Sequence, residues 1–244
     1  MGLVSKLVFA LSVLSLSAIA YPKYAMTVLE RPLTMPKNSF ETAMLFKNQN
    51  VMQLGLDYGA IDDYLQVGVF WNGFTVANEP YQGLSLNLAS SLFFSKYVNS
   101  MAKLSMPFQF NNQVLREISL GTPLYVAVFP GRFNVVFFDD LLRMNWSEKQ
   151  VAAQFAFGLR LSWQATRAMV LNLSSSFAVL DTAGSHKHIG MTSPLKLSAL
   201  YSISPLFDVV GEVGYSDFHQ SAFAGMSGLN FGLGILMRGG EIEG

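Results

Sequence analysis

Residues 151–163 read Val-Ala-Ala-Gln-Phe-Ala-Phe-Gly-Leu-Arg-Leu-Ser-Trp. Phe157 and Trp163 fall on one side of this alternating stretch, whereas Gln154 and Arg160 fall on the other. Successive side chains of a β-strand point to opposite faces, so the pattern predicts a strand with one apolar and one polar face. The stretch is longer than the roughly 9 to 11 residues with which a tilted strand crosses a bilayer, whereas soluble strands average about five or six.

A second alternating stretch follows after a predicted turn at residues 164–166. Leu171 and Leu173 share one face, and Asn172 and Ser174 share the other. The two stretches therefore predict an antiparallel hairpin with its apolar face on lipid and its polar face on a lumen.

The composition favours the same class. Hydrophobic residues make up 51% of the 244 positions and charged residues only 13%, against about 25% charged in soluble domains. No apolar run beyond the first twenty positions has the roughly 18 to 20 residues of a helical span. The zero net charge gives no reason to expect nucleic acid as a partner. The absence of cysteine excludes disulfides, cysteine metal sites and a lipoprotein anchor.

Hairpins recur along the chain. Tight turns are predicted near 60–63, 95–96, 130–131, 164–166 and 202–205. Longer polar links are predicted near 72–80, 107–119, 139–149, 181–190 and 217–225. Short turns face the periplasm in outer-membrane barrels, and long loops face outside.

Further strands at 40–46 and 51–58 bring the count to about twelve, an even number as in bacterial single-chain barrels. Residues 120–129 and 133–138 alternate poorly, so a count of ten stays open. The predicted fold is all-β: a transmembrane, antiparallel, up-and-down β-barrel over residues 39–238, followed by a short tail at 239–244.

The N-terminus predicts export. Lys6 precedes an apolar stretch at 7–16, and Ala18-Ile19-Ala20 is a small-x-small cleavage site. Residues 1–20 are therefore predicted to be a cleavable, Sec-type signal peptide, and the location to be the bacterial outer membrane. Three prolines interrupt residues 21–38, which are interpreted as a periplasmic lead-in.

Residues 54–68 read Leu-Gly-Leu-Asp-Tyr-Gly-Ala-Ile-Asp-Asp-Tyr-Leu-Gln-Val-Gly, and residues 31–37 read Arg-Pro-Leu-Thr-Met-Pro-Lys. The first segment resembles the strand-turn-strand unit of an uncharacterised porin-like outer-membrane β-barrel family of Gram-negative bacteria. Its usual form has Tyr-Gly, a hydroxyl residue and Asp, then Leu-Glu-Leu-Gly; here Ile61 and Gln66 depart from it. The second segment resembles the lead-in to the first strand. The resemblance implies a barrel and its location, and carries no catalytic residue.

Catalytic chemistry finds little support. His186 and His188 lie in a predicted external loop, where two ligands beside Lys187 are too few for a metal site. A serine hydrolase would use a pair such as His219 and Ser221, but such pairs in loops are usually incidental. We therefore expect no enzyme, no cofactor and no metal.

Charges on membrane strands are tolerated toward the lumen, so the charged residues on the polar faces are predicted to line it. They are Glu41, Lys47, Asp57, Lys103, Arg160, Lys196, Asp208, Glu212 and Arg238. Both signs are present, whereas a strongly selective channel would show one dominant sign. If the last tight turn centres on Ser204, Lys196 and Glu212 lie directly opposite each other and form an ion pair.

The predicted function is a passive channel or transporter for small polar solutes. A closed structural or adhesive barrel that binds partners through its loops is the alternative, and an outer-membrane hydrolase is a third. The expected partners are outer-membrane lipid, periplasmic chaperones, the barrel-assembly machinery and a small polar solute.

The signal peptide gives a direct prediction. The mature protein should begin at or near Tyr21 and fractionate with the outer membrane, because cleavage follows the small-x-small site. Intact-mass measurement of the protein from separated membranes checks this, and an uncleaved chain in the inner membrane would contradict it.

Overall fold

The structure is a computed structural model, and it describes residues 27–48, 51–61, 64–73, 83–109, 117–139, 141–146, 151–181, 194–215 and 229–240. The predicted signal peptide at 1–20, the start of the lead-in and the last four residues lie outside these ranges. Within them, the helical element is the short 3-10 turn η1 (Val28–Glu30). No helix in these ranges is long and apolar enough to span a membrane.

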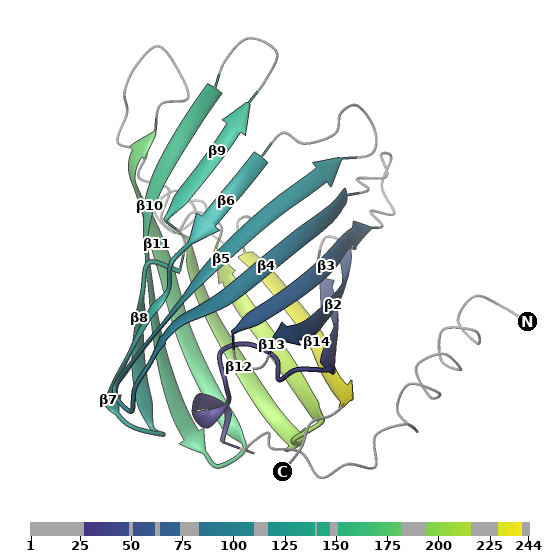
Figure 1. Cartoon of the computed structure of the whole chain (residues 1–244), viewed down its shortest axis with the longest axis vertical. Coiled ribbons are helices and arrows are strands. Elements are labelled where there is room, and N and C mark those ends of the chain that lie inside the picture. The colour runs from purple at the N-terminus through teal and green to yellow at the C-terminus, as the bar shows by residue number, and fades with distance from the viewer. Residues whose placement is uncertain are drawn as a thin grey trace, which may run out of the picture.

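The strands form one antiparallel sheet that closes on itself where β14 pairs with β1 (Figure 1). The segments are β1 (Ser39–Lys47), β2 (Val51–Ile61), β3 (Leu65–Gly73), β4 (Gly83–Phe94), β5 (Val98–Gln109), β6 (Glu117–Gly121), β7 (Leu124–Phe129), β8 (Phe133–Phe137), β9 (Leu142–Trp146), β10 (Val151–Thr166), β11 (Met169–Asp181), β12 (Leu195–Ser204), β13 (Phe207–Tyr215) and β14 (Leu229–Gly240).

Two strands of the barrel wall are each interrupted once. β5 pairs with both β6 and β7, and β10 pairs with both β8 and β9. β6 and β7 together therefore occupy one strand position, and so do β8 and β9. The fourteen segments thus make twelve strands. The predicted twelve-stranded, up-and-down barrel is confirmed. Figure 1 shows β6 and β9 at one end of the barrel and β7 and β8 at the other.

These interruptions explain the poor alternation of this region. Pro123 separates β6 from β7 and has no backbone N–H for the ladder, although its carbonyl accepts from Met101 N at 3.2 Å. Opposite it, Phe138 has a φ of 59°, which turns the chain out of the strand. The predicted link at 139–149 is wrong, because β9 resumes the ladder within it and pairs with β6 and β10.

The tight turns lie close to their predicted places, between β2 and β3 and at 95–97, 130–132, 167–168 and 205–206. The last two come later than predicted, because β10 continues to Thr166 and β12 to Ser204. At the ends of the longer links, β3 reaches Gly73 and β5 reaches Gln109. The last strand extends two residues past the expected boundary, to Gly240.

The two faces of the wall differ in chemistry. The outer face keeps large apolar side chains exposed, among them Leu56, Val69, Leu173, Leu197, Phe231 and Leu233. The buried side chains are mostly polar, among them Thr34, Asp57, Ser85, Ser91, Ser162, Gln164, Ser202, Asp208 and Arg238, with few hydrophobic ones beside them. A soluble fold buries its apolar residues, so this inverted distribution is that of a barrel with lipid outside and a polar lumen inside.

Adjacent positions on β12 test this assignment. Leu197 is 48% exposed on the outer face, whereas the neighbouring Ser198 faces inward and contacts Asn172 Nδ2 at 3.5 Å. Leu197→Arg should lower the free energy of unfolding by up to about 2 to 4 kcal/mol, the cost of a cation near the bilayer midplane. Ser198→Arg should cost less, because the lumen is polar and Glu212 lies opposite it.

Urea unfolding of both variants in lipid vesicles measures the difference. Equal losses at the two positions would contradict the assigned faces.

Candidate functional site: the lumen

Residues 27–37, which precede β1, lie inside the barrel, and we call them the strap. Its backbone reaches β10, where Leu29 N donates to Gln164 Oε1 at 3.2 Å, and β3, where Met35 N donates to Gln66 Oε1 at 2.9 Å. Both glutamines lie beside tight turns, so the strap crosses the lumen at the end where these turns lie (Figure 1). The sequence predicts a periplasmic lead-in at 21–38 and leaves open whether it enters the lumen; residues 27–37 do enter it.

The wall is shaped to receive the strap. A Cβ at Gly59 would collide with the backbone carbonyls of Met35 and Pro36, so only glycine allows this approach. Met35 is 3% exposed, and Thr34, fully buried, lies 3.4 Å from Ser91 Oγ. The strap is therefore packed against β2 and β4 and is not a loose tail.

Arg31 anchors the strap to the far wall. Its Nη1 lies 2.6 Å from Asp208 Oδ2, and its Nη2 donates to Asp208 Oδ1 at 3.2 Å. Nη2 also donates to Ser202 Oγ. The Arg31 side chain is 6% exposed and that of Asp208 is 0% exposed. Such bidentate, charge-assisted contacts are the strong class of hydrogen bond.

Arg238 joins the same network. Its Nη2 lies 2.7 Å from Asp208 Oδ2 and 2.5 Å from Glu41 Oε2, which its strand partner β1 carries directly opposite. Its Nη1 donates to the Pro205 carbonyl at 3.4 Å. The alternation placed Glu41, Asp208 and Arg238 inside, but it missed Arg31, because the periodicity of strands says nothing about a segment that lies across them.

A second cluster forms at the interruption between β8 and β9. Asp139 holds Lys103 Nζ at 2.9 Å with one oxygen and Arg160 Nη1 at 3.2 Å with the other. Gly121 permits this, because a Cβ there would collide with the Asp139 carbonyl. The sequence reading missed Asp139, which it assigned to an external link. Beside the cluster, Arg160 Nη2 lies 3.5 Å from Tyr125 Oη.

A third cluster joins Glu212 to two lysines. Lys196 Nζ lies 3.0 Å from Glu212 Oε2, and Lys47 Nζ lies 3.8 Å from Glu212 Oε1. The predicted ion pair forms, but the predicted register is wrong. Lys196 lies opposite Gly214, so its contact with Glu212 is diagonal. The pairing differs from the predicted one by two residues, because β12 continues to Ser204 and the turn lies at 205–206.

Asp57, the last of the nine predicted lumen charges, accepts a hydrogen bond from the Gln66 side chain. Its carboxylate lies directly over Gly68, where a Cβ would collide with it. All nine side chains thus lie on the inner face of the wall, and eight of them join the three clusters above.

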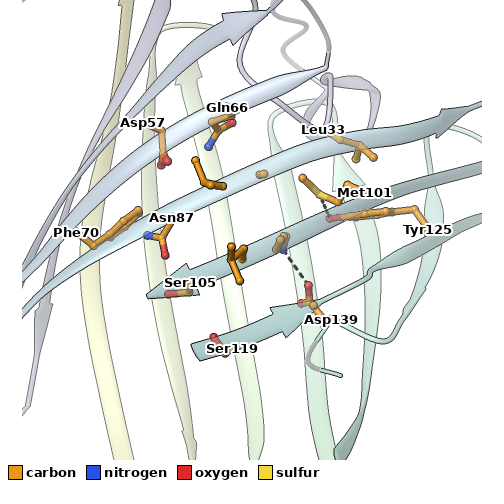
Figure 2. A pocket seen from close by; sticks show the side chains of 15 residues that line it. Leu33, Asp57, Gln66, Phe70, Asn87, Met101, Ser105, Ser119, Tyr125 and Asp139 are labelled. Carbon is orange, nitrogen blue, oxygen red and sulfur yellow. Dashed lines mark hydrogen bonds and ion pairs between the residues drawn. The ribbon is translucent and has the colours of Figure 1, made fainter. Parts of the chain in front are cut away.

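Two cavities lie between these groups. One, of about 480 Å³, is lined by Asp57, Asn87, Lys103, Ser105 and Asp139 among others (Figure 2). The other, of about 290 Å³, has a mixed lining: three arginines, Glu41 and several amide and hydroxyl side chains, together with apolar residues of the strap and of the wall. Leu33 and Tyr125 line both, so the strap and β7 form part of the partition between them.

No group of three or more His, Cys, Asp or Glu side chains in the described ranges is placed to hold a metal ion. The candidate residues His186, His188, His219 and Ser221 lie outside those ranges.

Comparison of the fold finds porins. The NanC porin superposes with a TM-score of 0.59 at 8% identity, over 81% of this chain and 98% of that one. The KdgM porin, solved in complex with disordered oligogalacturonate, gives 0.57 at 8% identity, over 82% and 98%. This chain has the fold of outer-membrane porins. No protein-family model matches the sequence, and no curated protein is significantly similar to it.

The third cluster predicts weak coupling between Lys196 and Glu212. The lysine side chain is 51% exposed, so solvent screens the pair and it should contribute about 0 to 1 kcal/mol. We expect Lys196→Met and Glu212→Gln to be non-additive by up to this amount in a double-mutant cycle of unfolding in one detergent. Strict additivity would show that the two residues are not coupled.

If Arg31 anchors the strap, removing its guanidinium should loosen the strap. In Arg31→Met, Asp208 keeps Arg238 but the strap loses its anchor, and breaking a buried pair costs about 3 to 5 kcal/mol. The chain contains no cysteine, so Leu33→Cys provides a single labelling site. Its reaction with a maleimide should be at least about tenfold faster in the Arg31→Met background, because local opening becomes easier.

Arg132→Met is the control, since Arg132 lies exposed in the turn at 130–132. Unchanged labelling in Arg31→Met would show that Arg31 does not hold the strap in place.

Proposed function

We propose that the protein is a passive channel of the bacterial outer membrane for small polar solutes. The main support for this proposal is the closed barrel, whose interior carries amide, hydroxyl and charged side chains around two cavities. A polar solute can exchange its hydration for such groups, whereas an apolar core would exclude it. The porin fold supports this reading, as does the complex of the KdgM porin with an oligosaccharide.

The strap restricts this channel. It crosses the lumen at the end with the tight turns, and Arg31 and the buried Asp208 hold it there. A solute would therefore pass beside the strap, which favours small molecules over polymers.

A closed structural or adhesive barrel is the second candidate, and the same strap favours it. The network of Arg31, Arg238, Asp208 and Glu41 is electrically balanced and largely buried, as expected of a seal. A hydrolase gains no support from the described residues, since all three histidines of the chain lie outside them.

We also propose how the protein reaches the outer membrane. The N-terminal signal peptide directs its export, periplasmic chaperones deliver it, and the barrel-assembly machinery inserts it. Lipid then covers the apolar outer face of the barrel.

Conductance of the purified protein in planar bilayers tests the function. The wild type should show discrete open levels, and Arg31→Met should show larger ones, because the freed strap widens the path. Silent wild-type insertions with a conducting Arg31→Met variant would identify a closed barrel sealed by the strap. Silence of both, in protein that retains its β-sheet circular dichroism spectrum, would overturn the channel.

A further inference from the structure

Three arginines from three different elements line the smaller cavity. Arg31 comes from the strap, Arg160 from β10 and Arg238 from β14. We call this space, of about 290 Å³, the arginine cavity. A guanidinium group presents a planar fork of N–H donors that matches a carboxylate. Three of them around one small cavity therefore favour a carboxylate as the ligand.

Within the described ranges, the carboxylates that contact the cations of this cavity do not balance them. Asp208 and Glu41 serve Arg31 and Arg238, while the acid that Arg160 contacts, Asp139, is shared with Lys103. Among the described residues, the cluster of Arg160, Lys103 and Asp139 is therefore left with one positive charge.

Arg160 is the most accessible of the three guanidinium groups. Its side chain is 27% exposed, against 6% for Arg31 and 4% for Arg238. An incoming anion would therefore meet Arg160 first, because Arg31 and Arg238 are more deeply buried and already paired with Asp208 and Glu41.

The same cavity also contains a neutral hydrogen-bond acceptor that has no donor, the side-chain oxygen of Asn134. Asn134 lines it from β8, and its side-chain oxygen is buried with no hydrogen-bond partner. A buried acceptor without a donor costs free energy, which a ligand hydroxyl would recover. Ser162 and Asn172 add further hydroxyl and amide groups to the lining.

We propose that the arginine cavity binds a small hydroxylated carboxylate, with its carboxylate on Arg160 and a hydroxyl donating to Asn134. The proposal deepens the proposed function, since it names the class of solute that pauses in the lumen, and it rests on that function for the solute's route. Binding itself does not require conduction, so the two can be tested apart.

The probes are gluconate and sorbitol, which have the same carbon chain and differ in one carboxylate. Titration calorimetry of the detergent-solubilised full chain at low salt should detect gluconate, with sorbitol at least about tenfold weaker, since a charge-assisted contact is worth about 1.5 to 3 kcal/mol. Arg160→Met should weaken gluconate binding by about tenfold or more. Asp139 keeps Lys103 as a partner in this variant.

Two variants make the test specific. Arg167→Met removes an arginine from the same hairpin, but from its exposed turn, and should leave binding unchanged. Asn134→Leu should weaken gluconate and not acetate, which has no hydroxyl to donate.

Equal affinity for gluconate and sorbitol would overturn the proposal, as would equal losses in Arg160→Met and Arg167→Met. Failure to bind gluconate by folded protein that conducts in bilayers would overturn the site and leave the channel standing. Gluconate binding by protein that never conducts would uphold the site and overturn the channel.

Discussion

The pairing of β14 with β1 is the constraint on which the rest of this molecule depends. A backbone amide or carbonyl without a partner is costly in hydrocarbon, so a sheet in a membrane must have no edge. Closure fixes which face of every strand looks outward, because side chains alternate strictly. Exposed leucines and phenylalanines then cover the outside, and the nine predicted lumen charges turn inward, where each of them has a hydrogen-bond or ion-pair partner.

Closure also creates a space that the wall cannot fill by itself. A barrel of twelve strands lies between the small barrels filled by their own side chains and the large porins with open channels. In this protein two features occupy the space: the strap, and the interruption of two wall strands. The strap crosses one end, received by Gly59 and held by Arg31, and the interruption at Pro123 and Phe138 brings Asp139 between Lys103 and Arg160.

Both features act on the electrostatics of the lumen. The strap contributes a cation to Asp208, and the interruption contributes the carboxylate that Lys103 and Arg160 share. Without Asp139 these two cations would lie near each other with no acid between them. A polar interior with paired but not fully balanced charges suits weak, reversible contact with a solute, which passage requires.

The sequence alone determined a closed barrel of about twelve strands, the two faces of its strands and the approximate positions of its tight turns, because these follow from local periodicity and turn chemistry. The exact count of twelve came from the structure, since residues 120–129 and 133–138 alternate poorly. It also brought Lys196 and Glu212 together, since a hairpin is a local structure, but their register differs because the turn lies later than predicted, at 205–206. Only the tertiary structure decided the position of the strap, the role of Arg31 and the inward turn of Asp139. These depend on contacts between segments far apart in the chain, such as the 177 positions from Arg31 to Asp208, and no local period encodes such contacts.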